Sequence, residues 1–385
     1  MKSFDVLIVG GGIMGGAIAW ELTRRNLRVA ILDRQEPWRE ASWAAAGMLS
    51  PSPEPGESPA WFPLAKASFD LYPAWVSEIE NEAGRPPLIR QEATLELFAG
   101  PQAESERDAL INQHQRLGLR TKAISLAYAK NLEPPIGPSI AAAALLSDEA
   151  IIDPRALGQT LLWALTRRGV EIRTGTEVSS LTTENHRCTG VMTSGGEVQA
   201  GHVVIAAGCY SSAIETVRPF APVHPVRGQM IALRQATPGP RRVLRSHRGY
   251  VVPRPDGRIV AGSTLENDGY EKRITPSGQM EILSAAIELA PSLANAEIVE
   301  TWSGLRPDTP DHLPIIGPVD VPAGRTVGIS GVAIATGHYR NGILLAPITA
   351  RLIAQSIVGE PLSLDVSPFS PLRFADLARR AAETR

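Results

Sequence analysis

The chain has 385 residues, which is long enough for about two domains that each bury a hydrophobic core. Its formal net charge is −2 and its acidic and basic residues are interspersed, so the composition excludes a nucleic-acid-binding surface. The 2 cysteines, Cys188 and Cys209, exclude a disulfide scaffold and a thiolate metal site, and they fit a reducing compartment. No stretch reaches the roughly 20 apolar residues of a membrane span. We therefore expect a cytoplasmic protein with no metal, no nucleic-acid partner and no integral membrane segment.

A glycine-rich turn directly follows the first predicted strand, at residues 4–9. Gly10 permits a sharp turn, Gly12 lets the backbone approach a phosphate group, and Gly15 lets the next helix pack closely on the strand. The N-terminus of that helix offers N–H groups and the positive end of its dipole to an anion. The second predicted strand ends on Asp33, an acid suited to a ribose hydroxyl. This spacing indicates a dinucleotide site rather than an ordinary turn, and it leaves open whether the dinucleotide is NAD or FAD.

Two segments of unusual composition come next. Small residues dominate positions 41–48, which predicts either backbone packed tightly against something large or a short buried helix. Prolines recur between positions 51 and 63, and they predict a loop that is neither helical nor paired in a sheet. A long loop of this kind inside a domain is usually a lid or a linker.

The middle of the chain mixes helical and buried-strand patterns. Residues 64–128 predict largely helical structure with charged faces. Asp153 and Pro154 suit the N-cap and the first position of a helix that Gly169 ends. The continuous apolar run at 203–208 is typical of a buried parallel strand.

The second half of the chain predicts strands and then returns to a buried strand and a helix. Segments 250–254 and 258–261 flank a Pro-Asp-Gly turn and predict a hairpin. Helices are predicted near 278–289 and over 343–358, and 326–336 has the character of a buried strand. This order predicts an α/β fold, α+β overall, in which a Rossmann-type dinucleotide-binding domain carries an inserted antiparallel-sheet substrate domain. The predicted bounds are 1–80, 150–224 and 320–370 for the discontinuous dinucleotide-binding domain, 81–149 and 225–319 for the substrate domain, and 371–385 for a C-terminal tail.

Five short segments carry a resemblance to a known family. They are residues 10–15, 42–49, 225–229, 304–307 and 337–347. Together, and in this order, they resemble the D-amino acid oxidase family of flavoenzymes, and within it the glycine oxidases of the thiamine pathway. The resemblance implies FAD rather than NAD, a small amino acid and O₂ as substrates, and a homo-oligomer, by resemblance a tetramer. The implied reaction converts glycine, O₂ and H₂O into glyoxylate, NH₃ and H₂O₂.

The same resemblance implies a set of cofactor-binding residues. Those at the glycine turn and the adenosine end are Gly10, Gly12, Ile13, Met14, Gly15, Asp33 and Arg34. Those nearer the flavin are Ala41, Ser42, Ala46, Gly47, Met48, Val178, His338, Tyr339, Arg340, Asn341, Gly342, Ile343 and Leu344. Many relatives place Glu where Asp33 stands, but the shorter acid should still reach the ribose. The break at 337–342 would aim a helix N-terminus at the flavin, where reduction places negative charge.

Three residues are implied to bind the substrate. Arg306 would clamp its carboxylate, because a planar guanidinium can hold two carboxylate oxygens at once. Tyr250 would add a hydrogen bond and close the pocket with its ring. Arg340 would help, with pairing to a structural acid as the alternative interpretation; for Arg306 the alternative is a structural ion pair. No side chain is assigned as catalytic, since the flavin carries the redox chemistry, and His338 is interpreted as structural or flavin-contacting.

Several alternatives stay open at this point. A D-amino acid dehydrogenase would use the same site but pass electrons to a quinone, and a hydrogen cyanide synthase subunit shares the fold. A non-enzymatic flavin-binding subunit and an NAD-dependent dehydrogenase are further alternative hypotheses. The sequence does not rank glycine, sarcosine and small D-amino acids. The loop at 51–63 looks unlike the corresponding loop of the family, which leaves substrate size open.

The cofactor is predicted to be bound without a covalent bond. Related sarcosine oxidases tether flavin through a cysteine beyond the Arg-Pro motif, whereas here residues 308–311 read Asp-Thr-Pro-Asp. Precipitation of the yellow protein with acid should therefore release free flavin into the supernatant, where its absorbance is measured. A yellow pellet over a colourless supernatant would contradict this prediction.

Overall fold

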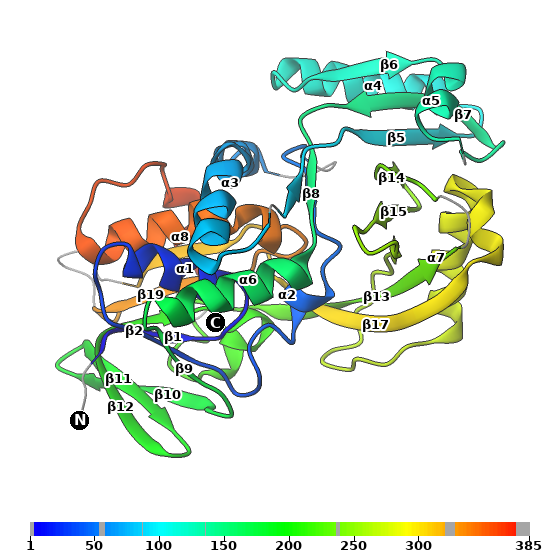
Figure 1. Cartoon of the computed structure of the whole chain (residues 1–385). Helices are drawn as coiled ribbons and strands as arrows, with labels where there is room; N and C mark the ends of the chain where they lie inside the picture. The colour runs from blue at the N-terminus through cyan, green and yellow to red at the C-terminus, as the bar shows by residue number, and fades with distance from the viewer. Residues whose placement is uncertain are drawn as a thin grey trace, which may run out of the picture.

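The computed structural model describes residues 4–53, 58–86, 88–134, 136–235, 239–319 and 328–374. Two eight-stranded sheets dominate it, and a small three-stranded sheet joins them. Figure 1 shows the first large sheet beneath a layer of helices and the second large sheet to its right. The mixed α/β fold class predicted from the sequence is confirmed.

The first sheet has a parallel centre. Strand order is β10-β11-β12-β1-β2-β9, with β19 also paired to β12 and β18 to β19. The pairs β12–β1, β1–β2, β2–β9 and β12–β19 are parallel, as a Rossmann-type sheet requires. The strands are β1 (Phe4–Val9), β2 (Val29–Leu32), β9 (Glu171–Arg173), β10 (Val178–Glu184), β11 (Arg187–Thr193), β12 (Gly196–Ile205), β18 (Ile315–Pro318) and β19 (Val332–Thr336).

Both faces of this sheet are buried, which explains the continuous apolar strands. Along β1, Val6 and Ile8 pack toward one core and Leu7 and Val9 toward another, because successive side chains of a strand point to opposite faces. Helices cover the first face (Figure 1). They are α1 (Ile13–Thr23), α3 (Trp61–Ala83), α6 (Pro154–Arg167) and α8 (Gly342–Val358).

The second sheet is mostly antiparallel. Its order is β17-β13-β16-β15-β14-β5-β7-β6, and only β14 and β5 pair in parallel among the described strands. The strands are β5 (Thr94–Ala99), β6 (Thr121–Ile124), β7 (Ile140–Leu146), β13 (His224–Arg234), β14 (Leu244–Ser246), β15 (Gly249–Pro253), β16 (Ile259–Gly262) and β17 (Glu297–Asp308). The predicted hairpin is confirmed as β15 and β16. Helices α4 (Ala103–Arg116), α5 (Leu126–Leu132) and α7 (Pro276–Leu289) complete this part.

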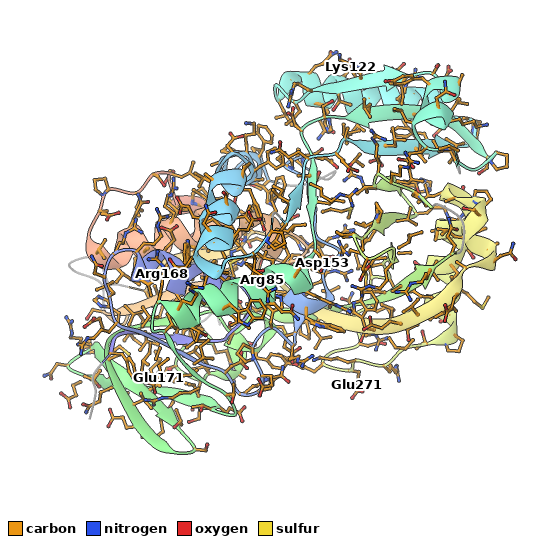
Figure 2. All side chains as sticks on the ribbon, viewed as in Figure 1. Arg85, Lys122, Asp153, Arg168, Glu171 and Glu271 are labelled. Atoms are coloured by element: carbon orange, nitrogen blue, oxygen red, sulfur yellow. The ribbon has the colours of Figure 1, made fainter. Side chains whose placement is uncertain are left out.

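Short elements connect the two sheets. The small sheet consists of β3 (Met48–Leu49), β8 (Ala150–Ile152) and β4 (Ile89–Arg90). Helix α2 (Ala41–Ala44) and the 3₁₀ turn η1 (Gly208–Ala213) both contact β17 of the second sheet. The 3₁₀ turns η2 (Pro291–Asn295) and η3 (Ser367–Phe369) follow α7 and α8 in the chain. Figure 2 places Asp153 at the junction, with Lys122 at the far edge of the second sheet and Glu171 in the first.

Several predicted helices are confirmed, and their ends have the expected causes. Asp153 caps α6, since its side chain accepts hydrogen bonds from the backbone N–H groups of Arg155 and Ala156. Gly169 follows the helix with φ +76°, a conformation that glycine adopts without strain. Helices α7 and α8 begin within two residues of their predicted starts.

Two predictions were wrong in part. More than half of the segment 64–128 is helical, as predicted, but strands β5 and β6 lie between its helices; Leu95 and Leu97 are buried and alternate with polar neighbours, which is a strand pattern. The proline-rich segment does not stay irregular as far as residue 63. Helix α3 begins at Trp61, and Pro63 fits its first turn, where no N–H is needed for the helix.

Some predicted segments lie partly or wholly outside the described residues. Residues 54–57 of the proline-rich segment and residues 375–385 of the predicted tail lie outside the described residues, as do 320–327. Strand β18, at Ile315–Pro318, pairs with β19 in the first sheet, although the predicted domain boundary falls after it. The domain bounds themselves stay a prediction. Among the described helices, none is long and apolar enough to cross a membrane.

Candidate active site

A cavity of about 730 Å³ lies between the two large sheets. One side is formed where parallel strands of the first sheet end, with Gly10 after β1, Asp33 after β2, Ala206 after β12 and His338 after β19. This is the edge at which open α/β sheets bind ligands. The other side comes from strands β13, β15 and β17 of the second sheet.

The cavity brings together most of the residues singled out in the sequence. Its lining includes Gly10, Gly12, Ile13, Met14, Asp33, Arg34, Ala41, Ser42, Ala46, Gly47, Met48, Val178, Tyr250, Arg306, His338, Tyr339, Arg340, Asn341, Gly342 and Ile343. Gly15 and Leu344 do not line it. Leu344 is 1% exposed in the hydrophobic core, and its carbonyl accepts a hydrogen bond from Ser68. The contacts of these residues with a bound cofactor stay a prediction.

The glycine turn is too tight for any larger residue. A Cβ on Gly10 would lie 2.4 Å from the Ala206 carbonyl oxygen, and Gly10 has φ +109°. A Cβ on Gly15 would lie 1.9 Å from the Gly10 carbonyl oxygen, so Gly15 lets α1 pack on the turn. The Ser42 hydroxyl accepts a hydrogen bond of 2.9 Å from the Ile13 N–H, which ties α2 to the start of α1. With no side chains in the way, the backbone of this turn can come close to the phosphate groups of a dinucleotide.

Asp33 is fixed at the edge of this turn. Its carboxylate accepts hydrogen bonds from the backbone N–H groups of Gly11, at 2.7 Å, and Gln35, at 3.0 Å. Burial raises the pKa of Asp33, although both hydrogen bonds act in the opposite direction. The residues present therefore fit the adenosine end of a dinucleotide.

The segment after α2 is held by the second sheet. Arg254 donates a hydrogen bond of 2.6 Å to the carbonyl of Ala46 and another of 3.3 Å to that of Ile152. The indole N–H of Trp302 donates to the carbonyl of Ala44 at 3.1 Å. Sequence reasoning missed Arg254 and Trp302, because contacts this distant in sequence leave no local pattern.

The helix α8 begins at the wall of the cavity. Its first residue is Gly342, and the preceding residues 337–341 make the predicted break. His338 is 4% exposed and bonds to the Thr349 hydroxyl at 3.1 Å. Burial lowers the pKa of His338 to about 3, so this imidazole is neutral and a poor base near neutral pH.

Arg306, on β17, and Tyr250, on β15, both line the cavity from the second sheet. The Arg306 guanidinium donates to the Ser263 hydroxyl at 2.6 Å and to the Thr264 carbonyl at 3.3 Å. The Tyr250 hydroxyl lies 3.5 Å from the sulfur of Met230. Both side chains line the cavity, and a carboxylate placed there could meet a cation and a phenol.

A partly buried charge cluster lines the cavity at the side of β5, and sequence reasoning missed it too. Arg245 forms ion pairs with Glu96, at 2.5 Å, and with Glu149, at 2.9 Å. Burial raises the pKa of Glu96 against the opposing effect of Arg245. The pairing of three charges from separate segments of the chain has no sequence signal. Among the described residues, no group of three or more His, Cys, Asp or Glu side chains could hold a metal ion.

Comparisons with known proteins find relatives that match nearly the whole chain. Residues 5–356 match the FAD dependent oxidoreductase family. The chain is 37% identical to glycine oxidase of Pseudomonas aeruginosa over 371 residues, covering 95% of this chain and 98% of that protein. It is 35% identical to the bifunctional protein ThiO/ThiG of Trichormus variabilis, covering 96% of this chain and 55% of that protein. The crystal structure of glycine oxidase from Geobacillus kaustophilus matches with a TM-score of 0.89 at 30% identity, covering 96% of this chain and 98% of that one.

The buried state of His338 predicts a pH dependence of stability. The folded protein keeps His338 neutral, whereas the unfolded chain protonates it below its ordinary pKa of 6.5. The contribution of the neutral His338 to the free energy of unfolding is therefore complete above pH 6.5 and is lost as the pH falls toward 3. Over this range the free energy of unfolding falls by up to about 1.4 kcal/mol per pH unit. The variant His338→Gln should lose this slope in urea unfolding measured between pH 7.5 and 4.5. Parallel curves for wild type and variant would contradict the assignment, and His186→Asn, at an exposed histidine, is the control.

Proposed function

This chain belongs to the family of FAD dependent oxidoreductases, and we propose that it oxidises glycine and other small amines or D-amino acids. The proposed reaction consumes glycine, O₂ and H₂O and produces glyoxylate, NH₃ and H₂O₂. The observation that carries the proposal is a single cavity that joins the glycine turn to Arg306 and Tyr250. The relatives named ThiO/ThiG support a role in supplying thiamine biosynthesis. A noncovalently bound FAD, a homo-oligomer and a cytoplasmic location complete the proposal.

The residues of the cavity fit FAD, the cofactor of this family. Gly10 and Gly12 would lie against its pyrophosphate and Asp33 at its ribose. Nearer the flavin would lie Ala41, Ser42, residues 46–48 and residues 338–343. When bound, FAD supplies the redox chemistry by accepting a hydride from the substrate and passing the electrons to O₂. The protein supplies the orientation.

Arg306 would set that orientation. A carboxylate held by both its oxygens on one guanidinium cannot rotate, so the substrate Cα is directed to one side. Tyr250, on the neighbouring part of the sheet, would add a phenolic hydrogen bond and limit the space beside Cα. With a pKa of about 3, His338 is too weak a base to take the proton of the substrate amine near neutral pH.

A peroxide-coupled assay tests the reaction. Purified FAD-loaded protein should produce H₂O₂ and glyoxylate from glycine in a ratio of about 1:1. Sarcosine and the two alanine enantiomers, tested in parallel, rank the substrates. Oxidation that proceeds only with a quinone or an artificial acceptor would favour a D-amino acid dehydrogenase, and no oxidation of any of these amines would contradict the proposal.

Removal of the guanidinium tests the substrate site. Arg306→Ala should lower kcat/KM for glycine by at least about 100-fold, equivalent to about 2.7 kcal/mol, because the carboxylate loses its charged partner. Flavin content should not change, since the glycine turn is untouched. Arg218→Ala, at an exposed arginine, is the matched control and should retain normal activity. A fully active Arg306→Ala variant would refute the clamp.

A further inference from the structure

The guanidinium of Arg306 lies directly over a glycine of the neighbouring strand. In the β13–β17 pair, Val226 is opposite Arg306 and Gly228 is two residues further along the same face. A Cβ on Gly228 would lie 2.2 Å from Nη2, 2.3 Å from Nη1 and 2.5 Å from Cζ of Arg306. Gly228 is therefore the floor on which the guanidinium rests.

The segment that follows β16 accepts hydrogen bonds from the same guanidinium. The Ser263 hydroxyl and the Thr264 carbonyl accept its hydrogen bonds, at 2.6 and 3.3 Å. The Thr264 hydroxyl accepts a hydrogen bond of 2.8 Å from the backbone N–H of Gln229. Gly228, on which the guanidinium rests, and Gln229, which bonds to Thr264, are thus adjacent residues of β13.

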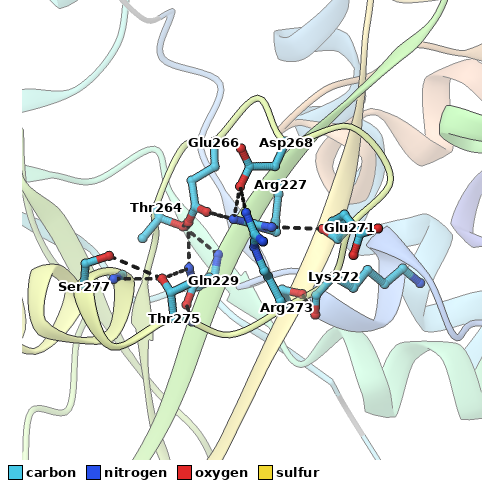
Figure 3. Close-up of polar contacts among 12 residues, drawn as sticks. Arg227, Gln229, Thr264, Glu266, Asp268, Glu271, Lys272, Arg273, Thr275 and Ser277 are labelled. Atoms are coloured by element: carbon cyan, nitrogen blue, oxygen red, sulfur yellow. Dashed lines mark hydrogen bonds and ion pairs between the residues drawn. The ribbon is translucent and has the colours of Figure 1, made fainter.

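A buried polar network keeps this segment in place (Figure 3). Arg227 is 1% exposed and forms ion pairs with Glu266 and Asp268. Glu266 also accepts hydrogen bonds from Gln229, at 2.8 Å, and from the Thr264 hydroxyl. Since a buried guanidinium without partners is costly, Arg227 favours the position of this segment in which Glu266 and Asp268 pair with it.

The two faces of β13 make different contacts. Gly228 lines the cavity, whereas Arg227 and Gln229 are not among its lining residues and bond to the segment behind it. Successive residues of a strand point to opposite faces, so the motif Arg-Gly-Gln presents a flat surface to Arg306 and two anchors to the supporting segment. The proposed function above assigns a role to Arg306 but none to this motif.

We propose that Gly228 is the positioning residue for Arg306, and that Arg227 and Gln229 hold the segment whose Ser263 hydroxyl and Thr264 carbonyl accept the hydrogen bonds of the guanidinium. This inference rests on the proposed function, in which Arg306 binds the substrate carboxylate. Gly228 would act through Arg306 and not by contact with the reacting atoms.

Addition of one methyl group tests this idea with little risk to the fold. Gly228 has no left-handed backbone, and the atoms that an alanine Cβ would meet belong to the end of a flexible side chain. Relief of the contact, from 2.2 Å to an ordinary 3.4 Å, requires the guanidinium to move by about 1 Å. A misplacement of about 1 Å can cost on the order of 100-fold in rate.

The experiment uses the FAD-loaded full chain and two readouts. Glycolate, a carboxylate of the size of glycine, is titrated while the visible absorbance of the flavin is followed, and steady-state oxidation of glycine is measured separately. Gly228→Ala should weaken glycolate binding and raise KM for glycine by at least about tenfold, with FAD affinity within about twofold of wild type. The control is Gly195→Ala, whose Cβ would meet only the Thr193 hydroxyl, at 3.7 Å.

A double variant separates positioning from a general structural effect. In the Arg306→Ala background, Gly228→Ala should cause no further loss of glycolate affinity, because the group that it displaces is absent. The inference is overturned if Gly228→Ala binds glycolate as Gly195→Ala does, if its loss persists in the Arg306→Ala background, or if FAD affinity falls in parallel. If Arg306→Ala itself binds glycolate and oxidises glycine normally, the proposed clamp fails, which is a different result from failure of Gly228 alone.

Discussion

The antiparallel pairing of β13 with β17 is the constraint on which the candidate site depends. It runs from His224 opposite Asp308 to Arg234 opposite Glu297, and it brings Arg306 to the cavity and Trp302 to α2. A shift of one residue in this register would turn every side chain of β17 to the opposite face. Arg306 would then leave the cavity. The position of the carboxylate site is therefore determined by strand pairing far along the chain from the glycine turn.

The junction between the two sheets is as important as either sheet. Arg155, in the first turn of α6, lies over the rings of Trp43 and Trp302, at 3.6 and 4.7 Å, and forms an ion pair with Glu300. Arg254 reaches across to the Ala46 carbonyl. Burial lowers the pKa of Arg254, so its hydrogen bonds are made by a charge that has given up water. These contacts fix the backbone that faces the cofactor relative to the strands that face the substrate.

Local patterns predicted part of this structure, and the rest depends on distant contacts. The glycine turn, the cap at Asp153 and the hairpin of β15 and β16 could be predicted because each is encoded by neighbouring residues. The strand β5 was missed because its alternation is short and lies between helices. Arg306 was found only through resemblance, since a lone arginine has no pattern. The Gly228 floor and the Arg254 tie could not be predicted, because each requires the strand register first.

A crystal structure of the FAD-loaded protein with glycolate tests the central claim most directly, because it locates a carboxylate relative to Arg306 without depending on rates. We expect both carboxylate oxygens to lie about 2.7–2.9 Å from the Arg306 guanidinium, with the guanidinium still resting on Gly228. A carboxylate bound instead to Arg340, or at the side of the cavity where Arg248 lies, would contradict it.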